Sequence, residues 1–324
     1  MENRLMRPVW ERLPAEERRE LLEQMGKRHG MLLLGEETFS RWGQTIHTAC
    51  FRRAGGEFVF VPGDTVTLGW ESFVQGMDEE NLAQLREEME NLGWEGTVEE
   101  FLGEQTTPVR QVTIGPMLVE RTLQTIGYEE VPLDDPRLTA RPDWLEDLAR
   151  AERENCQGLT ISGQVRFLKG ETGWQAELYH EISFPQLKEQ LAGQGFSLPT
   201  TDQWEYLCGG GCRTFFPWGD SLDLDFRLLY FGELEDSRPY DMKEPNFFGL
   251  SMAYDPYRLE LTVDPDGSLV HKGGDGGCNL CGGAGPVVGF LPCAPYFRYE
   301  EWRDGEELDD DYDFYRRVLE IRED

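Results

Sequence analysis

The sequence has no hydrophobic run long enough to cross a membrane. The run Met-Leu-Leu-Leu at 31–34 is far shorter than the roughly 20 apolar residues that a spanning helix needs. The first thirty residues contain Arg, Glu and Lys throughout, so the apolar segment of a secretory signal is also missing. We therefore expect no membrane partner and a cytoplasmic location.

Positive charge is scarce as well. The chain of 324 residues has 31 Lys and Arg against 62 Asp and Glu, which gives a net charge of −31. Such an excess repels phosphate backbones, so we expect no nucleic-acid partner. The charge does not indicate a disordered chain, because 39% of the residues are hydrophobic and 12% are aromatic. The composition predicts a folded acidic protein.

Histidine is rare, and the common catalytic motifs are missing. The four histidines form no His-x-x-x-His pair, and the sequence has no nucleophile elbow, phosphate-binding loop or dinucleotide fingerprint. The seven cysteines are an odd number, and a reducing compartment leaves them mostly as thiols. Clustered cysteines therefore indicate a metal or redox site rather than a disulfide framework.

The N-terminal half alternates between helical and strand patterns. Residues 14–27 begin with Pro and have an apolar edge, which predicts an amphipathic helix. Two β-rich runs within 58–69 flank Pro-Gly-Asp and predict a hairpin. Residues 78–92 predict a charged, solvent-facing helix that belongs to an insertion. Residues 109–114 alternate as a half-buried strand does, and 129–147 predict a surface loop that leads into a short helix.

The second half becomes irregular after two further helices. Residues 183–191 predict a helix with Ser183 as its N-cap, and 200–203 predict a capping box before a second helix. Beyond residue 208 the chain is rich in glycine and aromatic residues, with short strands and no repeat of fixed period. These patterns predict the α+β class.

Five short motifs follow one another between about residues 55 and 300. They are Val-Pro-Gly (61–63) with Thr-Pro-Val-Arg-Gln-Val (107–112), Phe-Ser-Leu-Pro-Thr-Thr-Asp-Gln-Trp-Glu-Tyr (196–206), Phe-Pro-Trp-Gly-Asp (216–220), Pro-Asn-Phe-Phe-Gly-Leu (245–250) and Lys-Gly-Gly (272–274). Their order and spacing resemble those of the formylglycine-generating enzyme family, also called sulfatase-modifying factors. The resemblance implies a C-type-lectin-like α+β fold with much irregular structure. We accordingly divide the chain into an N-terminal helical extension at 1–50 and a family-like domain at 51–324, with an insertion near 75–105.

The resemblance also implies two kinds of metal site. In the family, a block that corresponds to 249–261 helps to hold calcium, and here Asp255, Glu260 and Asp264 supply hard oxygen ligands for that ion. Catalytic members bind copper(I) with two cysteines that follow Arg-Gly-Gly-Ser. Cys278 aligns with the first of these two cysteines, and Gly283 stands at the position of the second.

The glycine-rich loop at 272–285 contains the sharpest chemical motif. Cys278 and Cys281 form a Cys-x-x-Cys pair, and Asp275 stands where the family has serine. Cys293 follows nearby, and we expect it to join Cys278 and Cys281 as a ligand of a soft metal. Two soft ligands at this spacing suit copper(I) or zinc. A four-cysteine zinc site with 208 and 212, a redox dithiol and a purely structural glycine loop are the alternatives.

Two functions follow from these patterns. The first is a metal- and oxygen-dependent oxidoreductase that acts on a peptide cysteine or related thiol, with Cys278, Cys281 and Asp275 as its catalytic residues. The alternative is a non-catalytic lectin-like module that binds a ligand or protein through loops on a rigid scaffold. Five aromatic residues are candidates to line its surface, namely Tyr254, Tyr257, Phe290, Tyr296 and Phe297.

Overall fold

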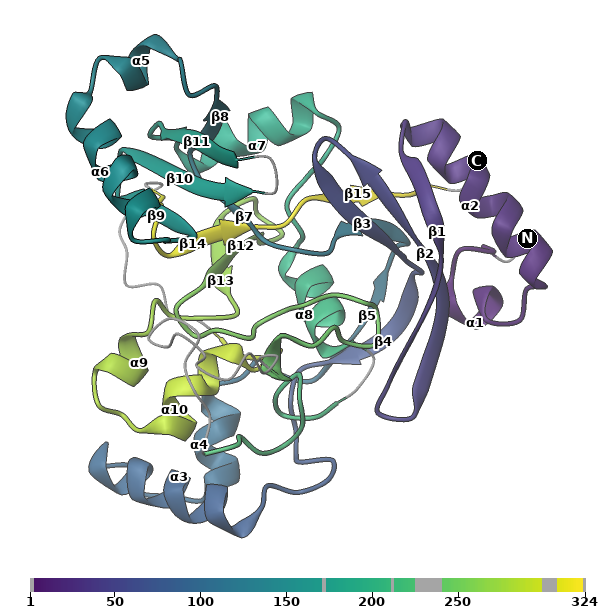
Figure 1. Ribbon diagram of the computed structural model, residues 1–324. Coiled ribbons are helices and arrows are strands. Elements are labelled where there is room, and N and C mark those ends of the chain that lie inside the picture. The colour runs from purple at the N-terminus through teal and green to yellow at the C-terminus, as the bar shows by residue number, and fades with distance from the viewer. Residues whose placement is uncertain (1–2, 171–172, 211–212, 225–240, 299–307, 323–324) are drawn as a thin grey trace.

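The computed structural model describes residues 3–170, 173–210, 213–224, 241–298 and 308–322. Helices and mainly antiparallel sheets alternate along the chain, which confirms the predicted α+β class (Figure 1). The described residues include no helix that is both long and apolar enough to cross a membrane. The two ends of the chain lie beside the same N-terminal helix in Figure 1.

The largest sheet has five antiparallel strands in the order β1-β2-β3-β6-β15. Its middle strand, β3, is buried on both faces. Phe58 and Phe60 join one apolar cluster, while Val59 and Val61 join another, because successive side chains of a strand point to opposite faces. The strands are β1 (Leu32–Arg41), β2 (Gln44–Arg53), β3 (Gly56–Val61), β6 (Met117–Glu120) and β15 (Val318–Glu320).

The N-terminal helices pack against this sheet. The predicted helix is confirmed as α2 (Ala15–His29), which follows a single turn, α1 (Arg7–Trp10). Leu22 and Met25 of α2 belong to the same apolar cluster as Phe58. The expectation of a helical extension over 1–50 is wrong beyond His29, because β1 and β2 follow and pair with the central sheet.

The predicted hairpin at 58–69 is wrong. β3 pairs with β6, whereas β4 (Asp64–Leu68) pairs with β5 (Arg110–Ile114). Val61 faces Met117 and Asp64 faces Ile114, so the register continues across the break and the four strands form one bent ribbon. At the bend, a Cβ atom on Gly63 would lie 2.5 Å from the carbonyl oxygen of Ile114. The turn sequence bends a strand here instead of reversing the chain.

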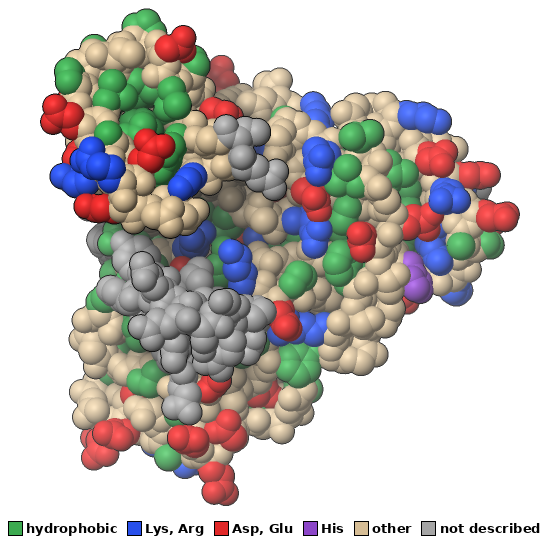
Figure 2. Space-filling view, in the orientation of Figure 1, with side chains coloured by type: hydrophobic (Ala, Val, Ile, Leu, Met, Phe, Trp, Pro, Cys, Tyr) green, Lys and Arg blue, Asp and Glu red, His purple; other side chains and the backbone are tan. Residues whose placement is uncertain are grey.

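The segment between β4 and β5 contains the predicted charged helix. It is confirmed as α3 (Glu79–Asn91) with Asp78 as its N-cap, and α4 (Val98–Glu104) follows. α3 is not wholly solvent-facing, because Leu85, Glu88 and Met89 are buried. Its outer face carries carboxylates that are visible at the lower edge of Figure 2.

Residues 128–179 form a small unit with its own core. A four-stranded antiparallel sheet in the order β8-β11-β10-β9 packs against two helices, with Trp144 and Phe167 among the buried residues. Sequence patterns predicted only a loop and a short helix in the first part of this region. The elements are β8 (Tyr128–Val131), α5 (Pro136–Thr139), α6 (Pro142–Arg153), β9 (Gly158–Ile161), β10 (Val165–Gly170) and β11 (Gly173–Tyr179).

The two capped helices in the second half are confirmed. Ser183 caps α7 (Phe184–Gly193) and Thr200 caps α8 (Thr201–Gly209), each with the reciprocal bonds of a capping box. α8 is almost entirely buried, and Trp204 lies at its centre in the core. The helix therefore fixes the middle of the domain.

The remaining elements surround the glycine-rich loop. A third sheet has the order β13-β12-β14-β7, in which β12 and β14 run parallel. The elements are β7 (Gln124–Thr125), the 3₁₀ turn η1 (Asp241–Lys243), β12 (Leu259–Val263), β13 (Leu269–Lys272), α9 (Cys278–Cys281), α10 (Pro286–Phe290), the 3₁₀ turn η2 (Leu291–Cys293) and β14 (Asp313–Tyr315).

Two buried ion pairs join the segment between β14 and β15 to the rest of the domain. Arg317 Nε donates to Glu120 Oε2 at 2.8 Å, and Arg316 Nε donates to Glu260 Oε1 at 2.8 Å. All four side chains are at most 8% exposed. Charges at such depth need partners, so these arginines stabilise β6 and β12 by neutralising their carboxylates.

Candidate functional site

The cysteine loop starts from a firmly held lysine. Lys272, the last residue of β13, donates from Nζ to Glu205 Oε1 at 2.9 Å and to the carbonyl oxygen of Phe297 at 2.8 Å. Lys272 and Glu205 are both buried, so this pair is a structural anchor. It fixes the position from which the loop leaves the sheet.

The loop then folds over the turn at 255–258. The backbone N–H of Asp275 donates to the carbonyl oxygen of Pro256 at 2.9 Å. A Cβ atom on Gly274 would lie 2.7 Å from the same oxygen, and one on Gly277 would overlap the ring of Tyr257. Glycine is needed here because the backbone of the loop lies directly on the turn.

Asp275 lies beneath the cysteines, with its side chain almost fully buried at 5% exposure. Its Oδ2 accepts a hydrogen bond from the backbone N–H of Asn279 at 3.0 Å, within α9. Its buried Oδ1 has no hydrogen-bond partner among the described residues. Burial raises the pKa of this carboxyl group, and the backbone hydrogen bonds only partly oppose the rise.

The two cysteines of the motif occupy the ends of the single turn α9 and are exposed. The hydroxyl oxygen of Tyr257 lies 3.0 Å from Cys281 Sγ, so the turn beneath the loop touches one of the thiols. Residues three apart on a helix are neighbours on its surface. The structure therefore brings Cys278, Cys281, Asp275 and Tyr257 together, and sequence reasoning had not included Tyr257 among the reactive groups.

Cys293 does not join the pair at the surface. It is fully buried and its thiol lies 3.6 Å from the carbonyl oxygen of Gly273. Burial raises the pKa of Cys293 well above its ordinary value, with Asp255, Asp275 and Cys208 adding to the rise. The sulfurs of Cys278, Cys281 and Cys293 do not lie within 4.8 Å of one another, so the expected three-cysteine metal set is not formed.

The alternative four-cysteine site is only partly described. Cys208 is buried in α8, and Cys212 lies outside the described residues. None of the six described cysteines forms a disulfide.

The three predicted calcium ligands do not form a common site. Asp255 Oδ1 accepts from the backbone N–H of Tyr257 at 3.1 Å, and burial raises the pKa of its carboxyl group. Glu260 pairs with Arg316, and Asp264 accepts from Thr201 Oγ1 at 3.1 Å. Their carboxylate oxygens do not all lie within 4.8 Å of one another, and each carboxylate serves a different structural contact.

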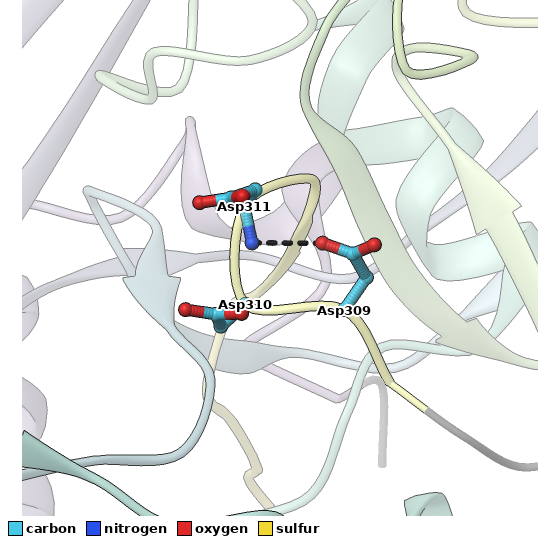
Figure 3. A group of neighbouring side chains, drawn as sticks. All are labelled: Asp309, Asp310 and Asp311. Atoms are coloured by element: carbon cyan, nitrogen blue, oxygen red, sulfur yellow. Dashed lines mark hydrogen bonds between the residues drawn. The ribbon is translucent and has the colours of Figure 1, made fainter. Parts of the chain in front are cut away.

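The structure instead groups the carboxylates of Asp309, Asp310 and Asp311, whose nearest oxygens lie within 4.8 Å of one another (Figure 3). Asp310 Oδ2 accepts from the hydroxyl of Tyr128 at 2.7 Å and Asp311 Oδ2 accepts from Ser162 Oγ at 2.8 Å. These bonds attach the small unit at 128–179 to the segment that precedes β14. Asp310 and Asp311 therefore have a structural role in this contact.

The five aromatic residues predicted to line a binding surface belong to the interior. Their exposed fractions range from 0% for Phe290 to 9% for Phe297. Four of them pack within the main apolar cluster or against the cysteine loop. The prediction that these five side chains line a binding surface is therefore wrong, because they are buried in the packed interior of the domain.

No protein-family model and no curated protein sequence matches the chain.

Proposed function

We propose that the chain is a divergent enzyme of the formylglycine-generating type, built on a C-type-lectin-like fold. In this proposal Cys278 and Cys281 bind copper(I), and the site oxidises a peptide cysteine or related thiol with dioxygen. The observation that carries the proposal is the pair of exposed thiols on one turn, held above the buried carboxylate of Asp275.

The spacing of the two thiols allows them to share one metal ion. Residues three apart on a helical turn have Cβ atoms about 5–6 Å apart. Two metal–sulfur bonds of about 2.3 Å each can bridge that gap. Soft thiolates select copper(I) or zinc. A structural zinc needs four ligands, and the described residues provide only two exposed thiols here, which favours copper(I).

The chain's own residues have distinct roles in this proposal. Asp275 orients the turn through the N–H of Asn279. Its second oxygen has no hydrogen-bond partner among the described residues and is positioned to hold a proton, which burial favours by raising the pKa of the carboxyl group. Tyr257 fixes Cys281 through its hydroxyl group. Copper, when bound, supplies the activation of dioxygen.

Copper titration tests the metal site. Reduced protein is titrated with Cu(I) without oxygen, in competition with a chromophoric chelator. We expect one equivalent to bind to the wild type and to Cys156→Ser, a matched control whose half-buried cysteine follows α6. The Cys278→Ser/Cys281→Ser variant should lose more than the roughly 10–100-fold that removal of an outer-sphere partner costs. Equal affinity in all three proteins would contradict the proposal.

Oxygen consumption separates catalysis from binding. Copper-loaded wild type should consume oxygen when given a cysteine-containing peptide, and Asp275→Asn should reduce kcat while leaving copper affinity unchanged. Copper binding without oxygen consumption would favour the alternative of a non-catalytic lectin-like module.

A further inference from the structure

Strand β1 leaves one edge of the five-stranded sheet open. It is the last strand in the order β1-β2-β3-β6-β15, and no other segment among the described residues pairs with its outer side. β3 pairs only with residues 50–53 of β2, so the outer part of the β1–β2 hairpin extends beyond the rest of the sheet (Figure 1). At the opposite edge the chain covers itself, because the backbone of Ser197 pairs with Val318 of β15.

The register of the hairpin identifies the backbone groups that face outward. The two residues of the turn at 42–43 have positive φ values of 53° and 74°, as a type I′ turn requires, so the residues that flank the turn form a hydrogen-bonded pair. Hydrogen-bonded and non-hydrogen-bonded pairs alternate along an antiparallel ladder. The N–H and C=O groups of Glu36, Thr38 and Ser40 therefore point away from β2, and no backbone hydrogen bond to another described segment satisfies them.

The side chains of this edge combine apolar surface with negative charge. Leu32 and Leu34 are 63% and 39% exposed. Glu37 is exposed and forms no salt bridge with a described residue, while Glu36 pairs at the surface with Arg19 at 3.2 Å. Natural edge strands often carry lysine or proline, which prevents pairing with another chain, and β1 has neither. Its backbone is therefore open to a further strand, and its charge selects which strand that is.

We propose that β1 binds an extended, basic peptide segment of a partner protein, which adds a strand to the sheet and places a lysine or arginine opposite Glu37. Backbone hydrogen bonds to Glu36, Thr38 and Ser40 supply the affinity, and cross-strand side-chain pairs supply the specificity. A second copy of the chain is disfavoured, because it would bring a further net charge of −31 and its own glutamates to the same edge. β1 lies apart from α9 in Figure 1, and the site does not depend on the proposed oxidase.

A labelled heptapeptide with blocked ends, Thr-Val-Thr-Lys-Thr-Val-Val, tests the proposal by fluorescence anisotropy. In an antiparallel added strand its lysine faces Glu37 and its last valine faces Leu34. We expect saturable binding to the wild type. Glu37→Lys should weaken binding roughly fivefold or more, because attraction across the strands becomes repulsion. Glu90→Lys is the matched control, since it changes the net charge equally at an exposed position on α3.

N-methylation of the peptide tests the backbone pairing without altering the protein. With the lysine opposite Glu37, the N–H groups of the two threonines beside it face β1, and the N–H of the lysine faces away. A methyl group on the backbone nitrogen of either threonine should abolish binding, whereas one on the backbone nitrogen of the lysine should be tolerated. In the wild type, bound peptide should slow hydrogen exchange at the amides of Thr38 and Ser40. The amide of Phe39, which already bonds to β2, should not change.

Three results would overturn the proposal: no binding of the unmethylated peptide, equal binding of the methylated peptides, or equal weakening by Glu37→Lys and Glu90→Lys. A fourth result would assign the edge to another occupant. If the amides of Thr38 and Ser40 become protected as the protein concentration rises without peptide, a second copy pairs with β1, and the basic partner is rejected.

Discussion

The carboxylate of Glu88 accepts hydrogen bonds from the backbone N–H groups of Val288 at 2.7 Å and Val287 at 3.2 Å. Glu88 lies on α3, in the predicted insertion, and the two acceptor bonds cap the start of α10. α10 in turn contacts the cysteine turn, because a Cβ atom on Gly289 would lie 2.6 Å from Leu280 Cδ1. The insertion therefore supports the candidate site through α10, which lies between α3 and the cysteine turn.

Glu88→Ala should destabilise the fold. Its removal leaves two backbone donors without their acceptor, and each buried unsatisfied donor costs about 1–3 kcal/mol. We expect the free energy of unfolding to fall by roughly 3 kcal/mol, measured by urea denaturation. The matched control is Glu87→Ala, on the exposed face of α3. A loss no larger than that of the control would show that the cap is not significant.

The buried carboxyl group of Glu88 should also make the stability of the fold depend on pH. Burial raises the pKa of its carboxyl group, so the folded state binds a proton more tightly than the unfolded state. Stability from this group therefore increases as pH falls through the raised pKa, and Gln at the same position cannot show this gain. We expect the wild type to gain stability relative to Glu88→Gln as pH falls from 7 towards 4.5, the ordinary pKa of the group. A constant difference across that interval contradicts the prediction.

The two glycines that flank α9 allow a matched test of the loop. Gly277 and Gly283 have φ values of 76° and 80°, so alanine at either position costs about 1–2 kcal/mol in backbone strain. Only at Gly277 does a Cβ atom overlap the ring of Tyr257, whereas nothing lies within 4 Å of one at Gly283. Gly277→Ala should therefore lose more stability in thermal unfolding and should also weaken copper binding, because Tyr257 must move away from Cys281. Equal effects of the two substitutions would disprove the close packing.

Substitution of Glu260 distinguishes a structural role of this carboxylate from a role in calcium binding. Glu260→Gln leaves the buried guanidinium of Arg316 without its counter-charge, so we expect a loss of about 3–5 kcal/mol with or without calcium. Asp264→Asn, whose carboxylate accepts from the hydroxyl of Thr201, is the milder control. Calcium-dependent stabilisation that is present in the wild type and lost in Glu260→Gln would restore the calcium interpretation. The measurement is chemical denaturation in excess chelator and in excess calcium.

The sequence predicted correctly those elements that are determined by residues close to them in the chain. The caps of α7 and α8 lie within four residues of the helices they start, so Ser183 and Thr200 were identified correctly. The prediction of a hairpin at 58–69 was wrong because β4 pairs with β5, a strand whose residues lie 42 to 50 positions further along the chain. The bend at Gly63 serves that pairing. A turn motif specifies a change of direction but does not specify which strand will be the partner.

The candidate site shows the same limit. Cys278, Cys281 and Asp275 were found because they lie within seven residues of one another. Tyr257 contacts Cys281 across 24 residues, and no pattern in the sequence connects the two positions. The burial of Cys293 depends on the packing of α8 and η2 around it, which the sequence around the cysteine does not reveal.

The position of Arg316 and Arg317 in the chain has a consequence for biosynthesis. Ribosomes add these two residues after both carboxylates that they neutralise, Glu120 and Glu260. Until then the nascent chain cannot bury either carboxylate without a large desolvation penalty. We therefore expect β6 and β12 to reach their final positions only after Arg316 and Arg317 have been synthesised, so that the domain completes its folding after translation of this segment.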